Sequence, residues 1–245
     1  MFVDTHCHIF KEYYKDIDKV ISDANNNGVN RIIVAADNYD SCLEVLELTN
    51  KYDNVYGCLG LHPENCLDEF DYSIFNNMSD KIVAIGEIGL DYHYGKDNKD
   101  MQINIFEKQL KLAEELNLPV VVHSRDATQD TIDILKKYNV RGVIHSFSGS
   151  LETANIYIKM GYKLGINGVI TFKNCNLKDV YNKIDLSNIL LETDSPYLTP
   201  EPYRGHSNSP EHIIDIAKYV ASIYNISIEE LSNITNKNVK DIFGI

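Results

Sequence analysis

The sequence predicts an α/β fold, a single-domain TIM (β/α)₈ barrel, from three features of the chain. Short runs rich in β-branched residues recur, and each is followed by a polar turn and an amphipathic stretch. The ends of the runs lie 22 to 36 residues apart, about the length of one strand–helix unit. With 245 residues the chain has the usual size of such a barrel, so we assign residues 1–245 to one domain. The eight runs end near His8, Asp37, His62, Glu87, His123, His145, Asn167 and Asp194.

An open, doubly wound parallel sheet is the alternative arrangement of these units. The presence of eight consecutive units favours a closed barrel. A second reason is that residue types that bind metals end the first, fourth, fifth, sixth and eighth runs. In a closed barrel those ends face one another across one mouth. We therefore expect a metal site at the C-terminal face of the strands.

The helices between the runs are recognisable from their apolar periodicity. Residues 98–117 place four apolar side chains on a single stripe, namely Ile103, Phe106, Leu110 and Ala113. Residues 211–223 show the same periodicity, and the segment after Asn225 is expected to form one or two short helices.

Composition and charge narrow the possible functions. The hydrophobic content of 44% and the charged content of 24% are typical of a soluble globular protein. We expect no membrane span and no signal peptide, and five cysteines without a C-x-x-C pair favour the reducing cytoplasm. A net charge of −13 argues against a broad basic surface, so a polyanionic substrate would be held locally by metal ions and a few cations.

The first run supplies half of a metal site. His6 and His8 are two residues apart in a strand, so their imidazoles point to the same side. The later runs add Glu87, His123, His145 and Asp194. Four imidazoles and two carboxylates can hold two divalent cations and leave positions open for water. Two such ions, about 3.5–4 Å apart, can bind both the attacking and the leaving oxygen of an in-line displacement. They also lower the pKa of a bound water molecule to about 7.

Six strings occur in order along the chain: D-T-H-C-H, G-L-H-P, G-E-I-G-L-D-Y, V-V-H-S-R-D-A, H-S-F-S-G and E-T-D-S-P-Y-L. Together they resemble the TatD family of metal-dependent hydrolases, in the amidohydrolase superfamily. The resemblance implies that His6, His8 and Asp194 hold one metal, that His123 and His145 hold the second, and that Glu87 bridges them. Phosphotriesterase-like relatives use a modified lysine as the bridge. Here Glu87 takes that place, and Lys81 lies at the wrong end of the strand.

The resemblance also implies an activity. Family members are metal-dependent nucleases, with DNase and 3′–5′ exonuclease activity. We therefore expect a monomeric hydrolase that cleaves phosphodiester bonds of DNA, at single-stranded ends, by metal-activated water. Glu87 and Asp194 would be catalytic, with Asp194 accepting the proton. Two divalent ions are expected as cofactors: Zn, Mg or Mn, with the four imidazoles favouring Zn or a similar transition metal.

Two rival functions stay open. The same site could hydrolyse an acyl substrate: an amide, an ester, a lactone or an aminoacyl-nucleic acid. The superfamily's carbonyl chemistry and the net charge of −13 motivate that alternative. The second rival is a metal-stabilised scaffold without catalysis, against which the intact ligand set argues.

Two further residues are candidates for substrate binding. His62, in G-L-H-P, ends the third run; by resemblance it contacts substrate, and the alternative is a loop imidazole in the proline turn. Arg204 lies in a loop similar to the family's R-G-x-x-N-x-P, where its guanidinium could bind a phosphate. Family members often have basic residues where this chain has His206 and Ser207, which weakens the expected grip on a long nucleic acid.

The roles of two other charged residues are less determined by the sequence. Asp4 points like His6 and could orient a ligand, or it could be an ordinary hydrogen-bonded polar residue. Arg125 follows the fifth run at the same mouth and could instead brace its own loop through Asp126.

Overall fold

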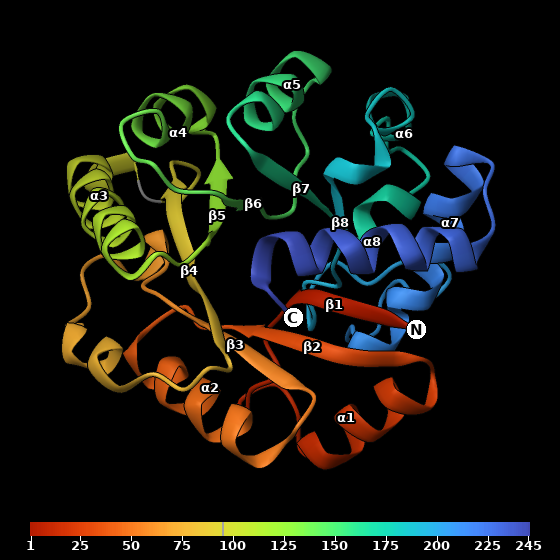
Figure 1. Cartoon of the computed structure of the whole chain (residues 1–245), viewed down its shortest axis with the longest axis horizontal. Helices are drawn as coiled ribbons and strands as arrows, with labels where there is room; N and C mark the ends of the chain where they lie inside the picture. The colour runs from red at the N-terminus through yellow and green to blue at the C-terminus, as the bar shows by residue number, and fades with distance from the viewer. Residues whose placement is uncertain (95) are drawn as a thin grey trace.

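Eight parallel strands form one sheet in which each strand pairs with the next along the chain. This computed structural model describes residues 1–94 and 96–245. The strands are β1 (Phe2–Cys7), β2 (Val29–Ala35), β3 (Val55–Leu59), β4 (Ile82–Asp91), β5 (Val120–Arg125), β6 (Gly142–Ile144), β7 (Tyr162–Ile166) and β8 (Ile189–Leu191). The sheet curves into a nearly closed barrel surrounded by helices (Figure 1), which confirms the predicted fold class.

Backbone hydrogen bonds join the first strand to the segment after the last one. The Asp194 N–H donates to the His6 carbonyl at 2.9 Å, and the His8 N–H donates to the Ser195 carbonyl at 2.7 Å. The strands lie in chain order and these bonds connect the two ends of the sheet, so the open doubly wound alternative is wrong.

Seven helices pack outside the barrel: α1 (Ile17–Asn26), α2 (Tyr39–Lys51), α3 (Lys99–Leu116), α4 (Thr128–Leu135), α5 (Leu151–Lys159), α6 (Lys178–Tyr181) and α7 (Ile213–Tyr224). In α3 the side chains of Phe106, Leu110 and Ala113 are fully buried, as the apolar stripe predicted. The helices predicted at 98–117 and 211–223 are thus confirmed to within two residues at each end.

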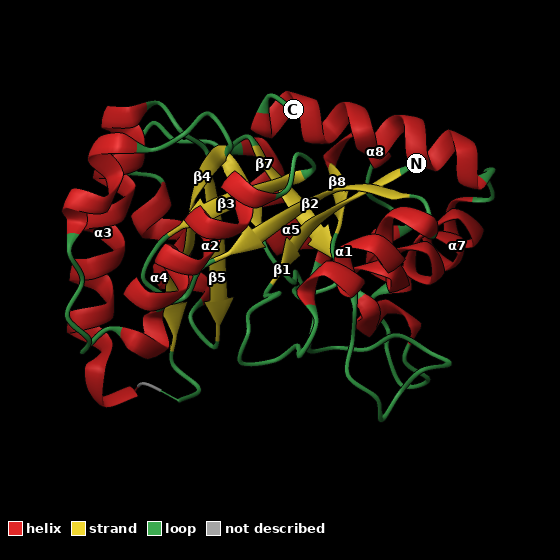
Figure 2. Cartoon of the chain, turned by 90° about the horizontal axis from the view of Figure 1, so that it is seen from below, coloured by secondary structure: helices red, strands yellow, loops and turns green. Residues whose placement is uncertain are grey.

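The inside of the barrel is packed with small and branched side chains: Val3, Ile33, Ala35, Cys58, Val83, Ala84, Val121, Val143 and Leu190. The last helix, α8 (Ile228–Phe243), adds Val239, Ile242 and Phe243 to this cluster. It therefore covers the N-terminal end of the barrel, on the side where both termini lie (Figure 2). A single 16-residue helix replaces the one or two short helices expected, because Ser227 caps its start and one face is buried throughout.

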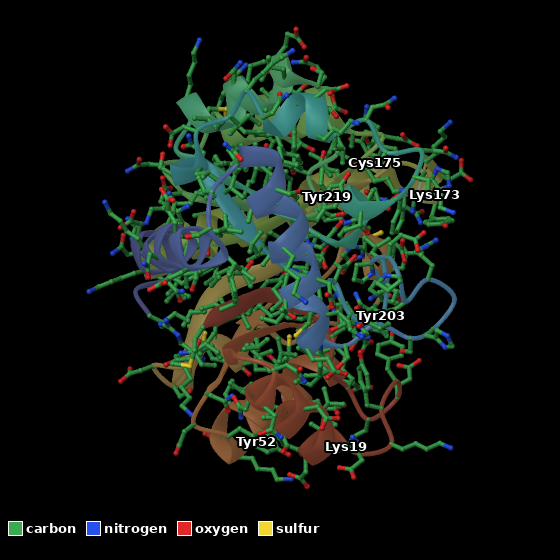
Figure 3. The ribbon with its side chains drawn as sticks, turned by 90° about the vertical axis from the view of Figure 1, so that its right-hand side faces the viewer. Lys19, Tyr52, Lys173, Cys175, Tyr203 and Tyr219 are labelled. Carbon is green, nitrogen blue, oxygen red and sulfur yellow. The ribbon has the colours of Figure 1, made fainter. Side chains whose placement is uncertain are left out.

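The loops after the strands gather on the opposite side of the molecule (Figure 2). Lys173 and Tyr203, on the loops after β7 and β8, lie on this side, away from α8 (Figure 3). The candidate functional residues are thus on the face where (β/α)₈ enzymes carry their sites. In the part of the chain that is described, no helix combines the length and apolar character needed to cross a bilayer. All five cysteines are free thiols.

Candidate metal centre

His6 and His8 leave β1 pointing into the mouth of the barrel, and both are buried. Their Nε2 atoms lie 3.1 Å apart. The Nδ1 of His8 lies 2.9 Å from the Ala35 carbonyl, which can only accept a hydrogen bond. Nδ1 therefore carries the proton of the neutral ring, and the Nε2 lone pair faces the centre.

Glu87, on β4, stands between two groups of histidines. Its Oε2 faces β1, at 3.3 Å from His6 Nε2 and 3.8 Å from His8 Nε2. Its Oε1 faces the other side, at 3.0 Å from His123 Nδ1 and 3.6 Å from His145 Nε2. This division of the two carboxylate oxygens is the geometry of a bridging ligand. Burial opposes ionisation, but the surrounding histidines hold the pKa of Glu87 well below its usual range, so the group is a carboxylate.

Asp194 faces Glu87 from the far side of the centre. Its Oδ1 lies 3.6 Å from His8 Nε2 and 3.7 Å from the Nε2 atoms of His6 and His145. The residue follows β8 in a left-handed conformation, with φ of +57°, which turns its side chain into the mouth. Burial opposes ionisation here too, yet the neighbouring histidines, His145 above all, keep the pKa of Asp194 low.

His145 is held by a carboxylate that the sequence analysis did not assign. Its Nδ1 lies 3.0 Å from Glu192 Oε1, which also accepts the Ser146 N–H at 2.6 Å. The proton on Nδ1 leaves Nε2 free to bind a metal. Burial lowers the pKa of His145, but Glu192, Glu87 and Asp194 outweigh it and raise the pKa to about 10. The signal for Glu192 was a charged residue inside an apolar run, since a buried carboxylate needs a partner.

The resemblance implied that His145 and His123 hold the same metal, and in the structure His145 also lies next to the ligands of the other metal. Its ring stacks on His6 with centroids 3.6 Å apart and lies 6.4 Å from the ring of His123. Its Nε2 nevertheless reaches both carboxylates, Glu87 and Asp194. His145 can therefore serve a metal on either side of Glu87.

His123, at the end of β5, lies between two carboxylates. Nδ1 faces Glu87, and Nε2 lies 3.0 Å from Asp91 Oδ2. Asp91 thus holds the ring of His123 with Nδ1 toward the centre, whereas the ring of His145 has Nε2 toward the centre. Burial opposes protonation, but the bonds to Asp91 and Glu87 raise the pKa of His123 to about 9. Asp91 is the second residue whose role the sequence analysis did not assign, although it lies in the same G-E-I-G-L-D-Y string as Glu87.

His62 presents a proton rather than a lone pair. Its Nδ1 accepts the Glu64 N–H at 3.2 Å, and its Nε2 lies 3.6 Å from Glu87 Oε1. Burial lowers the pKa of His62 to about 3, so the ring is neutral at physiological pH. The single ring proton is therefore on Nε2, where it can be donated to a group bound at the centre.

The spacing of the donor atoms suits divalent cations. Ligands at 2.0–2.2 Å around a tetrahedral ion are about 3.3–3.6 Å apart, further than most hydrogen-bonded atoms. The contacts of His6 and His8 with the two carboxylates span 3.3 to 3.8 Å. Three sets of side chains are close enough to hold an ion: His6–His8–Glu87, His6–His145–Asp194 and His62–Glu87–His123.

The substrate-binding candidate Arg204 lies at the rim of the mouth. Its guanidinium sits 3.9 Å above the ring of Phe172 and donates to the Thr199 carbonyl at 3.4 Å. Phe172 follows β7, so this contact links the loops after β7 and β8. Among the described residues no carboxylate pairs with Arg204, which leaves its charge available.

Arg125 and Asp4 are also placed by the structure. Asp126 forms its ion pair with His93, at 3.1 Å, so it does not brace Arg125, whose guanidinium lies over the ring of Tyr94. Asp4 accepts the backbone N–H and the hydroxyl of Thr193, at 2.9 and 2.6 Å. It thus ties β1 to the segment after β8 and is a structural, hydrogen-bonded residue.

A family model described as "TatD related DNase" matches residues 3–244. The chain belongs to the TatD family. It is 39% identical to the "uncharacterized metal-dependent hydrolase YabD" of Bacillus subtilis, with both chains covered fully. It is 36% identical to YcfH of Escherichia coli, another metal-dependent hydrolase, over 99% of this chain and 96% of that protein.

Solved structures agree with this assignment. The TatD homologue YjjV of Escherichia coli superposes with a TM-score of 0.94 at 32% identity, covering 100% of this chain and 98% of that one. A TatD-family hydrolase of Entamoeba histolytica gives 0.89 at 26% identity, covering 99% and 97%. This TatD-family chain is therefore a metal-dependent hydrolase with a (β/α)₈ barrel.

Proposed function

We propose that this TatD-family hydrolase is a deoxyribonuclease that removes nucleotides from single-stranded DNA ends. In this proposal two divalent ions are held by His6, His8, Glu87, His123, His145 and Asp194. The observation that carries it is the position of Glu87, whose two oxygens face separate groups of histidines. The family model's description as a DNase family supports the choice of substrate.

The ions would lower the pKa of bound water to about 7 and neutralise charge on the phosphoryl group. Zinc, manganese and magnesium all accept such ligands, and the number of imidazoles favours zinc or a similar transition metal.

The side chains around the centre have separate tasks in this proposal. Asp194, which the neighbouring histidines keep ionised, takes the proton from the attacking water. His62 donates its Nε2 proton to a phosphoryl oxygen, where negative charge develops. Arg204, at the rim, binds a phosphate of the strand through its guanidinium. We also propose that the enzyme acts as a monomer and in the cytoplasm, where its five free thiols would stay reduced.

The decisive experiment combines metal analysis with cleavage of single-stranded DNA labelled at either end. The wild type should contain about two divalent ions per chain and shorten the DNA from one end, with activity lost on chelation and restored by metal. Glu87→Gln should lose metal and reduce cleavage by more than about 100-fold. The control Glu69→Gln changes an exposed carboxylate and should behave as the wild type. Full metal-restored cleavage by Glu87→Gln would refute the proposal.

Acyl hydrolysis is the second candidate, favoured by the net charge of −13. A panel of esters, lactones, amides and aminoacyl-nucleic acids, measured beside phosphodiesters with the same metal-loaded enzyme, separates the two. Turnover of an acyl substrate without phosphodiester cleavage would select this alternative.

A further inference from the structure

A cavity of about 360 Å³ opens beside the metal centre, between the ends of β5 and β6. Its size is within the range of small-ligand pockets, about 300–1,000 Å³. Helix α4 follows β5 and helix α5 follows β6, and the two helices are neighbours outside the barrel (Figure 1). Thr128 of α4 and Thr153 of α5 line the cavity. His145 contributes to its lining, so the cavity is continuous with the centre that Glu87 and Asp194 define.

The lining offers mainly hydrogen-bond donors. Six hydroxyl-bearing residues line it: Ser124, Thr128, Ser146, Ser148, Thr153 and Tyr157. Arg125 is the arginine of the lining, and no carboxylate within the described ranges 1–94 and 96–245 forms an ion pair with it. Asp126, the acid of the lining, lies 3.1 Å from His93.

Tyr157, on α5, also lines the cavity. The side chain is 1% exposed, and its hydroxyl makes no hydrogen bond of ordinary geometry with any described residue. Burial raises the pKa of Tyr157 to about 12, with Ser124 acting in the opposite direction, so the phenol keeps its proton.

The start of α4 adds to the positive potential. Thr128 is its first residue and lines the cavity, and no side chain caps the free backbone N–H groups of the first turn. The N-terminus of a helix attracts anions through these N–H groups and the helix dipole. A cation, several hydroxyls and an uncapped helix end together match an anion with several oxygens.

We propose that this cavity, the β5–β6 subsite formed by Arg125, Thr128, Ser148 and Tyr157, binds a second phosphate of the substrate. The inference rests on the proposed phosphodiesterase function and extends it. The scissile phosphate lies at the metal centre, and a neighbouring or terminal phosphate lies in the subsite, held by protein groups alone. The enzyme should therefore prefer a substrate with a phosphate next to the bond that it cleaves.

The test uses a thymidine dinucleotide with one internal phosphodiester, and the same dinucleotide with an added 5′ or 3′ terminal phosphate. With the wild type, a terminal phosphate at one end should raise kcat/KM about tenfold. Arg125→Gln should reduce this gain to about twofold or less, and Tyr157→Phe should reduce it about threefold without lowering the unfolding midpoint. The matched control is Arg141→Gln, which alters an exposed arginine before β6, at the other end of the barrel, and should keep the full gain.

An equal gain in Arg125→Gln and in the wild type would overturn the subsite and leave the proposed function intact. The absence of any gain from either terminal phosphate would overturn it as well. If no dinucleotide is cleaved, the proposed function fails, and calorimetric binding of the same three dinucleotides decides the subsite alone. Tighter binding of a phosphorylated dinucleotide, lost in Arg125→Gln and kept in Arg141→Gln, would then support it; equal binding of all three would refute it.

Discussion

Replacement of Glu192 by glutamine tests how the protein tunes a metal ligand. Glu192 Oε1 forms an ion pair with His145 Nδ1 at 3.0 Å and accepts a hydrogen bond from the Ser146 N–H at 2.6 Å. Glutamine keeps one oxygen, so both contacts can form, but the negative charge of the ion pair is lost. Hydrogen bonds to charged groups contribute about 1.5–3 kcal/mol and neutral ones about 0.5–1.5 kcal/mol, so about 1–1.5 kcal/mol of support for the imidazole is lost.

That difference corresponds to a roughly tenfold loss of intrinsic metal affinity, the lower end of the 10- to 100-fold range typical of such partners. A second effect opposes the first at neutral pH. Glu192 makes the largest contribution to raising the pKa of His145 to about 10, and in the wild type a metal must displace that proton. In the variant the pKa of His145 is lower than in the wild type. Its metal affinity should therefore stop rising at a lower pH than that of the wild type.

The assay is calorimetric titration of metal into chelated protein, in competition with a chelator, from pH 7 to 10. The variant should bind more weakly at the alkaline end, and the gap should narrow toward pH 7. Gly165→Ala should act in the same direction without altering the carboxylate, because a Cβ there would lie 2.3 Å from Glu192 Oε2. Asp4→Asn is the control, since Asp4 bonds Thr193 and no imidazole. Identical affinity curves for Glu192→Gln and the wild type would refute the reasoning.

Three further outcomes are expected. Metal uptake at pH 7 should release about two protons per chain, because without metal the pKa values of His123 and His145 are raised to about 9 and 10. The apparent metal affinity should therefore rise with pH. Calorimetry in buffers of different ionisation enthalpy counts the released protons. His62→Ala should lower kcat by about 100- to 1,000-fold and leave the metal content unchanged, whereas loss of metal would show that His62 is a ligand. Phe106→Ala, at a fully buried position of α3, should lower the free energy of unfolding by about 3–5 kcal/mol in urea titrations; a cost below about 1 kcal/mol would contradict its place in the core.

The sequence predicted the barrel because its signals are local and repeated. The apolar stripe of residues 98–117 and the run that ends at Glu87 each reflect the period of one element, and the recurrence of such units indicates the topology. The convergence of the candidate ligands followed from that topology, because parallel strands in a closed barrel bring their C-terminal ends to one mouth.

The contacts that orient the metal ligands could not be predicted from the sequence in the same way. Whether Glu192 bonds His145, or Asp91 bonds His123, depends on how side chains reach across neighbouring strands. The proton position on His62 depends on a single backbone N–H two residues later. The long α8 was also underestimated, because its burial depends on the barrel end that it covers.

The seam between the first and last strands has a consequence for biosynthesis. His6 and His8 emerge from the ribosome at the start of translation, whereas Asp194 emerges only near its end, and it is joined to His6 by a backbone bond. A nascent chain that stops before β8 has the histidines but neither the last strand nor the opposing carboxylate. The metal centre can therefore be completed only when translation of the chain is nearly finished.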